Sequence, residues 1–400
     1  MTRTVAVLLT GLAILLLAQG LADPTTTTAT PLAVRYVSTS GVDTGACTNQ
    51  ASPCRTINYA RTQSNAGDTV RLAPGTYVEN VNLFTDITIE GAGAAPAAVV
   101  VDGGGAERVF AIFNGHITLR NLTVRNGDST LQGYGGGIMN NSQLLLDRVV
   151  VRDNYAPNHG GGVYNGGHLT IRRSVIENNV SDEVAGGLFN GGTAVIEHST
   201  FTNNQSTGLH VYGGAIHNNS TWTLTMTNST VSGNSAASGA GISNSGTVTL
   251  SHVTIANNTA ILNFGSGVSN YGSVSFKSTI VSGNVGGAQC EGGGSFISLG
   301  YNLDTGDTCR FNQASDLRNA DSALMALGDY GGPTPTHFLR PVSAAIDAAT
   351  NTGCPADDQR GVARPIDGDG ANGARCDIGA VEFEPGRVYF NMFLPWLMVR

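Results

Sequence analysis

Residues 169–179 read LTIRRSVIENN, and a segment of the same pattern, AVIEHSTFTNN, follows at 194–204, 25 positions further along. Seven segments between Ile117 and Asn284 open with this alternation of apolar and polar residues, and six are followed by a glycine-rich element such as GGGVYN. Such alternation is typical of β-strands. Strands this short cannot bury an apolar face alone, but coils stacked about 4.8 Å apart bury it together. The repeat predicts an all-β fold, a right-handed parallel β-helix of ~25-residue coils and about nine turns.

Two columns of asparagine recur in register through the repeats. One column contains Asn154, Asn179, Asn204, Asn234, Asn258 and Asn284, and the other contains Asn140, Asn165, Asn190, Asn218, Asn244 and Asn270. An asparagine at the same corner of every coil can bond the amides above and below it and so form a ladder. Asparagine also tolerates the left-handed backbone of a tight corner, which is the alternative role of any single member. Because each column has six members, we expect two ladders whose residues also turn the corners.

The N-terminus has the composition of a segment for secretion. Residues 1–22 contain one arginine, an apolar run and small residues at the end, which is typical of a cleaved signal peptide; an uncleaved membrane anchor is the alternative. A Thr-rich linker follows at 23–34. We therefore expect a secreted, extracellular protein with no transmembrane span in the mature chain. Attachment to the cell surface is left open.

The β-helix is expected to cover residues 35–302, with both ends closed. A short helix near 53–60 can cover the first coil, where an open sheet edge would invite aggregation. We interpret 303–384 as a C-terminal cap on the last coil and 385–400 as an apolar tail that is too short to span a bilayer. For the tail, a final strand, a disordered end and an anchoring signal all remain open.

The composition limits the kinds of partner. Of the 400 residues 40% are apolar and 12% are charged, so the chain can bury a large core and is not generally disordered. The formal net charge is -8 and Lys277 is the single lysine, so nucleic acid is not an expected partner. We expect a monomer that contacts an extracellular polysaccharide or a cell-envelope component.

The six cysteines form three local groups in the sequence. Secreted proteins commonly carry disulfides, and six cysteines allow fifteen pairings. Clustering along the chain favours the three local pairs, at separations of 7, 19 and 22 residues: Cys47–Cys54, Cys290–Cys309 and Cys354–Cys376. None of these gaps matches the ligand spacing of a zinc knuckle.

Short motifs at both ends of the repeats resemble known families. The motifs RYVS (35–38), CRTI (54–57), GDTV (67–70) and PGTY (74–77) resemble secreted right-handed parallel β-helix proteins of the pectin lyase-like superfamily, over about residues 35–300. The later motifs resemble the choice-of-anchor Q domain, found at the end of secreted β-helix proteins: LGDYGG (327–332), AAID (344–347) and CDIGA (376–380). That second resemblance implies a surface or secreted protein without catalytic activity.

The candidate binding residues form a row on one strand of each coil. Between a core position and the ladder asparagine lies one outward residue per coil: Met139, Tyr164, Phe189 and His217. Tyr134 and Tyr212 lie in loops that precede these strands, and the loop 205–212 is expected to overhang the row. Flat aromatic rows suit sugar rings, so the row predicts a carbohydrate site. Aromatic packing that only stabilises the sheet is the alternative.

Acidic residues do not gather as a polysaccharide lyase requires. One outward column alternates in sign, which predicts a ladder of salt bridges: Arg120, Asp147, Arg172 and Glu197. A second outward column contains Arg125, Arg152 and Glu177, with Asp153 beside it. Neither column offers the several acids that would hold Ca²⁺, nor the adjacent aspartates of a galacturonan hydrolase. The run DGDG at 367–370, with Asn372 and Asp377, lacks a complete calcium loop and is interpreted as an ordinary turn.

We therefore expect no catalytic residues, metal or cofactor. The preferred function is a secreted or cell-surface β-helix protein that binds extracellular glycans or acts as an adhesin or structural module. The alternative is a polysaccharide lyase or glycoside hydrolase of the pectin lyase-like type, which would act on uronate polymers and for which Ca²⁺ would be the cofactor.

Overall fold

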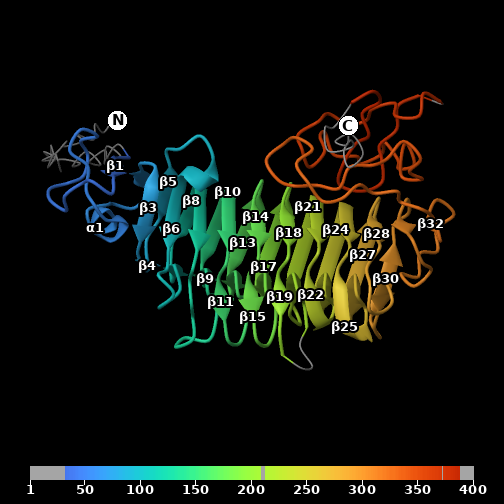
Figure 1. The fold of residues 1–400 in the computed structure, drawn as a ribbon, viewed down its shortest axis with the longest axis horizontal. Helices are drawn as coiled ribbons and strands as arrows, with labels where there is room; N and C mark the ends of the chain where they lie inside the picture. Colours follow the sequence, from blue (N-terminus) through green and yellow to red (C-terminus); the bar gives the residue numbers. More distant parts are fainter. Residues whose placement is uncertain (1–31, 209–211, 372, 388–400) are drawn as a thin grey trace, which may run out of the picture. The chain divides into compact units, whose positions relative to one another are not determined.

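A computed structural model describes residues 32–208, 212–371 and 373–387. The predicted signal peptide, most of the linker and the end of the apolar tail lie outside these ranges. Within them, strands stack into a parallel β-helix of about nine turns, which confirms the predicted all-β solenoid (Figure 1). The helical content of the described ranges is small: α1 (Ile57–Thr62) and the 3-10 turn η1 (Pro96–Ala98).

One representative coil shows how the repeat folds. Its four strands are β13 (His168–Arg172), β14 (Val175–Glu177), β15 (Val180–Ser181) and β16 (Leu188–Asn190). Each strand pairs in parallel with its counterpart in the next coil: β17 (Thr193–Glu197), β18 (Thr200–Thr202), β19 (Gln205–Ser206) and β20 (Ile216–Asn218). Equivalent residues therefore lie directly above one another along the solenoid.

The strands belong to three parallel sheets. The largest sheet includes β13, β14, β17 and β18 of the two coils above. Its other strands are β1 (Val34–Val37), β2 (Thr69–Leu72), β3 (Gly75–Val78), β5 (Ile87–Gly91), β6 (Val99–Asp102), β8 (His116–Arg125), β10 (Gln143–Arg152), β21 (Thr223–Ser232), β24 (Thr247–Ala256), β27 (Ser273–Lys277), β28 (Ile280–Ser282), β30 (Ser295–Ser298), β31 (Leu303–Asp304) and β32 (Leu317–Arg318). The second sheet includes β4 (Val81–Leu83), β7 (Phe110–Ile112), β9 (Ile138–Asn140), β12 (Val163–Asn165), β16, β20, β23 (Ile242–Asn244), β26 (Val268–Asn270) and β29 (Cys290–Glu291). The third includes β11 (Tyr155–Ala156), β15, β19, β22 (Ser235–Ser238) and β25 (Thr259–Phe264).

The interior consists of stacked columns of single residue positions. Three predicted apolar columns are fully buried, represented in one coil by Ile171, Ile176 and Leu188. Both asparagine ladders form: the Asn179 amide donates to Asn204 Oδ1 at 2.9 Å, and the Asn165 amide donates to Asn190 Oδ1 at 2.7 Å. Because side chains repeat at every coil, hydrophobic burial and polar satisfaction both run continuously along the axis.

At the corner beside the first ladder, one residue adopts the left-handed conformation and the next residue forms the ladder bonds. The expectation that the ladder asparagines themselves adopt the left-handed conformation is wrong: that conformation belongs to the preceding residue in each coil, including Asn178 (φ 53°) and Asn203 (φ 54°). Two coils use Gly233 and Gly283 there, consistent with the lower strain of Asn and Gly in this region. The ladder residue is thereby free to point inward.

A short serine ladder, which sequence reasoning missed, lines the other corner of the largest sheet. The Ser174 backbone N–H donates to Ser199 Oγ at 3.2 Å, and the Ser199 N–H donates to Ser229 Oγ at 3.1 Å. Each hydroxyl in turn donates to a carbonyl two residues earlier in its own coil. The signal was visible in the sequence as three serines in register, but valine and threonine at the same position in other coils obscured it.

Both ends of the solenoid are covered. The predicted N-terminal helix is α1, which begins after the N-cap Thr56 and buries Ile57 and Ala60 in the core. At the other end, Phe311 is buried against Phe276, with ring centroids 5.2 Å apart. The three predicted disulfides are all present: Cys47–Cys54, Cys290–Cys309 and Cys354–Cys376.

The rest of the C-terminal region does not cap the last coil, contrary to the expectation for 303–384. After β32 it turns back and lies along the flank of β18, β21 and β24 (Figure 1). Gln359, which is fully buried, bridges two coils because its amide donates to Thr200 Oγ1 at 2.8 Å and accepts from Thr230 Oγ1 at 2.6 Å. Polar positions that a free solenoid would expose to water are thus covered by protein.

Candidate functional site

The predicted aromatic row forms on the second sheet. Met139, Tyr164, Phe189 and His217 occupy equivalent positions of β9, β12, β16 and β20. The rings of Tyr164 and Phe189 are parallel within 3°, with centroids 5.3 Å apart, and the Phe189 and His217 centroids are 5.4 Å apart. The register of the coils therefore builds a continuous stack, as expected from the spacing.

Two loop residues cover part of this row. His159 stacks on Phe189 at 4.7 Å and 10°, and Tyr134 lies 5.2 Å from the Tyr164 ring. Phe189 is only 7% exposed, whereas Tyr134 is 38% exposed. Phe189, which the spacing places at an outward position, is inaccessible because His159 of a loop stacks on its ring. The accessible part of the cluster is formed by Tyr134, His159 and Tyr164.

Other side chains of the protein also contact the two ends of the row, at Met139 and His217. The Arg108 guanidinium contacts Met139 Sδ, and burial lowers the pKa of Arg108. Burial, together with the nearby His159, lowers the pKa of His217 to about 4. His217 Nδ1 lies 3.2 Å from Ser243 Oγ. The imidazole of His217 is therefore uncharged at neutral pH.

Tyr212 lies at the end of the loop predicted to overhang the row. It is 42% exposed and bridges to Ser238 of the next coil. Residues 209–211 of that loop lie outside the described ranges. Among the described residues no ring contact joins Tyr212 to the row, so the structure does not bring it together with Tyr134 and Tyr164.

The alternating column of charges forms the predicted salt-bridge ladder from Arg120 to Arg172, but among the described residues no ion pair joins Glu197 to it. It begins two coils earlier, where Arg71 pairs with Glu90. Asp147 is its centre: the carboxylate is 3.5 Å from Arg120, 3.0 Å from Arg172 and 2.6 Å from Arg173. Burial alone would raise the pKa of Asp147, but hydrogen bonds from the last two arginines outweigh it and lower that pKa.

The second outward column contains no group of acids. Arg125 pairs with Asp102 at 2.8 Å, and Arg152 pairs with the adjacent Asp153 at 3.2 Å. Glu177 lies next to Arg152 in the sheet, and its pKa is raised, chiefly by burial. Each guanidinium thus has a carboxylate partner, and the column forms structural ion pairs.

A polar cleft, which sequence reasoning missed, lies between the solenoid and its C-terminal flank. Its volume is about 360 Å³ and its lining includes Arg172, Arg173, Glu197, His198 and Asp357. His198 Nε2 lies 3.1 Å from Asp357 Oδ1, although the two residues are 159 positions apart. No local pattern could have predicted this pair, because its two members meet only when the flank docks.

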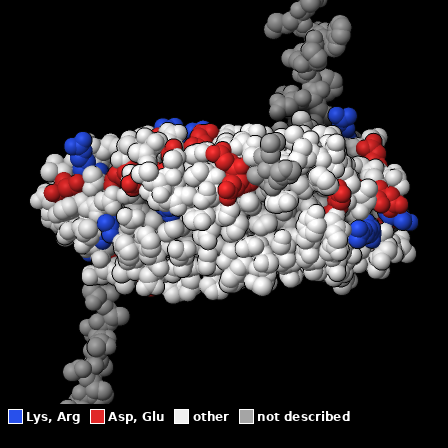
Figure 2. Space-filling model, turned by 90° about the horizontal axis from the view of Figure 1, so that it is seen from below, with Lys and Arg blue, Asp and Glu red and all other residues white. Residues whose placement is uncertain are grey.

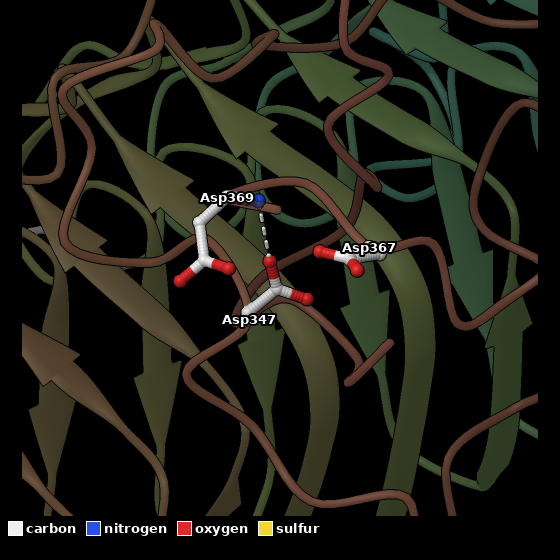
Figure 3. Close-up of side chains that lie close together, drawn as sticks. All are labelled: Asp347, Asp367 and Asp369. Atoms are coloured by element: carbon white, nitrogen blue, oxygen red, sulfur yellow. Dashed lines mark hydrogen bonds between the residues drawn. The ribbon is translucent and has the colours of Figure 1, made fainter. Parts of the chain in front are cut away.

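The acidic turn of the C-terminal flank brings together Asp347, Asp367 and Asp369, each offering an oxygen within 4.8 Å of the others (Figure 3). Asp347 is buried, and its Oδ2 accepts the backbone N–H groups of Gly368 and Asp369, both at 2.8 Å. Asp377 instead accepts the N–H of Asp347, and Asn372 lies outside the described ranges. These bonds are those of an aspartate-stabilised turn, the interpretation preferred from the sequence.

Charged side chains are sparse over much of the molecule. A view from below the orientation of Figure 1 shows broad areas without Asp, Glu, Lys or Arg (Figure 2). Among the described residues no helix is long and apolar enough to cross a membrane.

Comparisons with known proteins agree with this fold. The chain is similar to pectate lyase Pel9A, with a TM-score of 0.55 and 17% identity over 88% of this chain and 96% of that one. A second solved structure, Escherichia coli YbhC, gives a TM-score of 0.35 and 16% identity over 57% of this chain and 75% of that one. At 17% identity the likeness to Pel9A shows the fold alone, and nothing is concluded from the second match. No curated protein sequence matches the chain.

The family described as "Right handed beta helix region" matches residues 43–247. This span is about half of the 400 residues and includes the N-terminal coils and the central repeats. Its handedness agrees with the prediction made from the repeat. The chain therefore belongs to the right-handed β-helix family, and its fold is similar to that of pectate lyase Pel9A.

Proposed function

We propose that this protein is a secreted, non-catalytic β-helix protein that binds extracellular glycans as an adhesin or structural module. The observation that supports this function is the aromatic cluster of Tyr134, His159 and Tyr164 on a rigid sheet. Tyr134 keeps 38% of its surface exposed although its ring packs against both neighbours. An exposed ring held in place by other rings can stack on a sugar without losing much conformational freedom.

The cluster also offers polar groups at a suitable position. The phenol of Tyr164 is half-buried, and burial raises its pKa, so it remains a neutral hydroxyl near pH 7. A neutral phenol can both donate and accept hydrogen bonds with sugar hydroxyls. Together the rings and the phenols provide one apolar face and adjacent polar groups, the usual composition of a small-molecule site.

Tyr134→Ala on the full chain tests this function. A glycan array first identifies a bound sugar, and titration calorimetry then compares the wild type with the variant. We expect affinity to fall about tenfold, equivalent to roughly 1.4 kcal/mol, while the melting temperature moves little. Phe264→Ala, which removes a ring that is 51% exposed on the third sheet, is the matched control. Unchanged binding by the Tyr134 variant would contradict the assignment of this cluster.

A polysaccharide lyase is the second candidate, favoured by the polar cleft. Arg172 and Arg173 could neutralise a uronate carboxylate there, and His198, oriented by Asp357, could act as a base. Absorbance of unsaturated uronate products, measured on polygalacturonate with and without Ca²⁺, separates the two functions. Turnover that is lost in His198→Gln would establish the lyase and refute the non-catalytic proposal.

A further inference from the structure

A second pair of exposed aromatic rings lies on a different part of the surface. Phe84 and Phe113 follow β4 and β7, and they occupy the corner between the second sheet and the largest sheet in consecutive coils. Their rings are parallel within 9°, with centroids 5.0 Å apart. They are 51% and 46% exposed, so their outer parts face solvent. Exposed apolar rings that no loop covers indicate a surface for a partner.

A shallow groove begins three residues after Phe113, on the outer face of the largest sheet. Its volume is about 350 Å³, and it crosses β8, β10, β13 and β17. Its floor contains Thr118, Leu145, Thr170 and Val195, which lie side by side in register. Its rim contains polar side chains such as His116, Gln143 and His168. The groove therefore alternates apolar contacts with hydrogen-bonding groups.

The groove lies within two columns that carry no Asp, Glu, Lys or Arg, and the Asp86 carboxylate lies at its first coil, 3.3 Å from His116 Nδ1. Two outward columns of the largest sheet carry no Asp, Glu, Lys or Arg over seven coils, one from His116 to Ser273 and the other from Thr118 to Ser275. Toward the C-terminal coils these positions are hydroxyls: Thr223, Thr225, Thr247, Thr249, Ser273 and Ser275. The charged column lies two residues further along each strand, at the next outward position.

We propose that this face binds a neutral polysaccharide chain that runs along the solenoid axis, with Phe84 and Phe113 as a stacking platform at one end. Strands of adjacent coils lie about 4.8 Å apart, which is close to the length of one pyranose ring, so each coil presents its groups to one sugar unit. Hydroxyl and amide side chains can bond sugar hydroxyls, and Leu145 and Val195 of the floor can contact the ring faces.

The lack of charge selects against acidic chains. A uronate polymer would bring one carboxylate per sugar into a surface that offers no arginine or lysine within the two columns, so each carboxylate would lose hydration without gaining a partner. A neutral chain carries no such cost. This inference goes beyond the proposed function, since it assigns a second site, on a different sheet, and the chemical class of its ligand.

Titration calorimetry of the full chain tests this site. The probes are neutral β-1,4-linked hexasaccharides of glucose, xylose and mannose, with hexagalacturonate as the acidic comparison. We expect at least one neutral probe to bind and hexagalacturonate not to bind. The double variant Phe84→Ala/Phe113→Ala should weaken that binding about tenfold or more. Thr170→Arg, which fills the groove without touching the platform, should weaken it as well if the double variant proves unstable.

The controls separate this site from the aromatic cluster of Tyr134. Phe264→Ala should leave the affinity for the neutral probe unchanged. Loss of neutral binding in Tyr134→Ala would place that ligand at the other cluster and overturn the present inference while supporting the proposed function. Three other results would also overturn the inference. They are no binding of any neutral probe, tighter binding of hexagalacturonate than of the neutral probes, and unchanged affinity in both Phe84→Ala/Phe113→Ala and Thr170→Arg.

Discussion

Substitution of Asn204 by alanine measures what a ladder residue contributes to stability. Asn204 is fully buried and makes four side-chain hydrogen bonds. Its amide donates to Ile176 O at 2.8 Å and to Asn234 Oδ1 at 3.0 Å, and its Oδ1 accepts from both nitrogens of Asn179. Alanine removes all four bonds and leaves the surrounding buried groups without these partners.

The expected loss follows from the number of bonds. A typical hydrogen bond contributes about 1 kcal/mol net, and a buried group left without a partner costs about 1–3 kcal/mol. Four bonds therefore predict a decrease of about 3–5 kcal/mol in the free energy of unfolding. Urea unfolding followed by circular dichroism gives this quantity from the shift in midpoint at constant slope.

The neighbouring Asn203 is the matched control. It adopts φ 54°, its side chain is exposed, and glycine accepts that conformation without strain, so Asn203→Gly should cost less than about 1 kcal/mol. The comparison distinguishes the ladder role from the turn role because the two residues are adjacent and chemically identical. Equal losses in the two variants, or a loss below about 1 kcal/mol for Asn204→Ala, would refute the reasoning.

Three further changes test other parts of the structure. Phe189→Ala, at a ring stacked between Tyr164 and His217, should cost about 3 kcal/mol and lower the melting temperature by several degrees; an unchanged melting temperature would show that the row is not structural. Burial lowers the pKa of His217 from 6.5 to about 4, so between these two pH values the unfolded chain binds a proton that the folded chain excludes. The free energy of unfolding should therefore fall by on the order of 3 kcal/mol between pH 7 and pH 4. His217→Gln should remove this part of the pH dependence in urea titrations carried out at several pH values. Loss of the Cys290–Cys309 disulfide in a Cys290→Ser/Cys309→Ser variant should cost about 3 kcal/mol, since it closes a loop at the last coils; calorimetry showing no change would contradict this.

The sequence by itself determined the features that repeat. The period placed the core columns, and the two asparagine columns were sufficient to predict the ladders that Asn179 and Asn165 form. The disulfides were predictable as well, because their partners lie close in sequence and loop closure favours near neighbours. In each case the interaction joins residues whose spacing is set by the coil itself.

The tertiary structure alone decided the features that depend on contacts between distant segments. The C-terminal flank lies along the solenoid because Gln359 meets Thr200 and Thr230, and no periodicity encodes a contact across such separations. His159 covers Phe189 because a loop, which has no repeat constraint, directs it there. At the first ladder, the left-handed conformation likewise belongs to the residue before each asparagine and not to the asparagine itself. Features that repeat in every coil can be predicted from their spacing in the sequence, whereas the positions of loops and docked segments depend on the surfaces they contact.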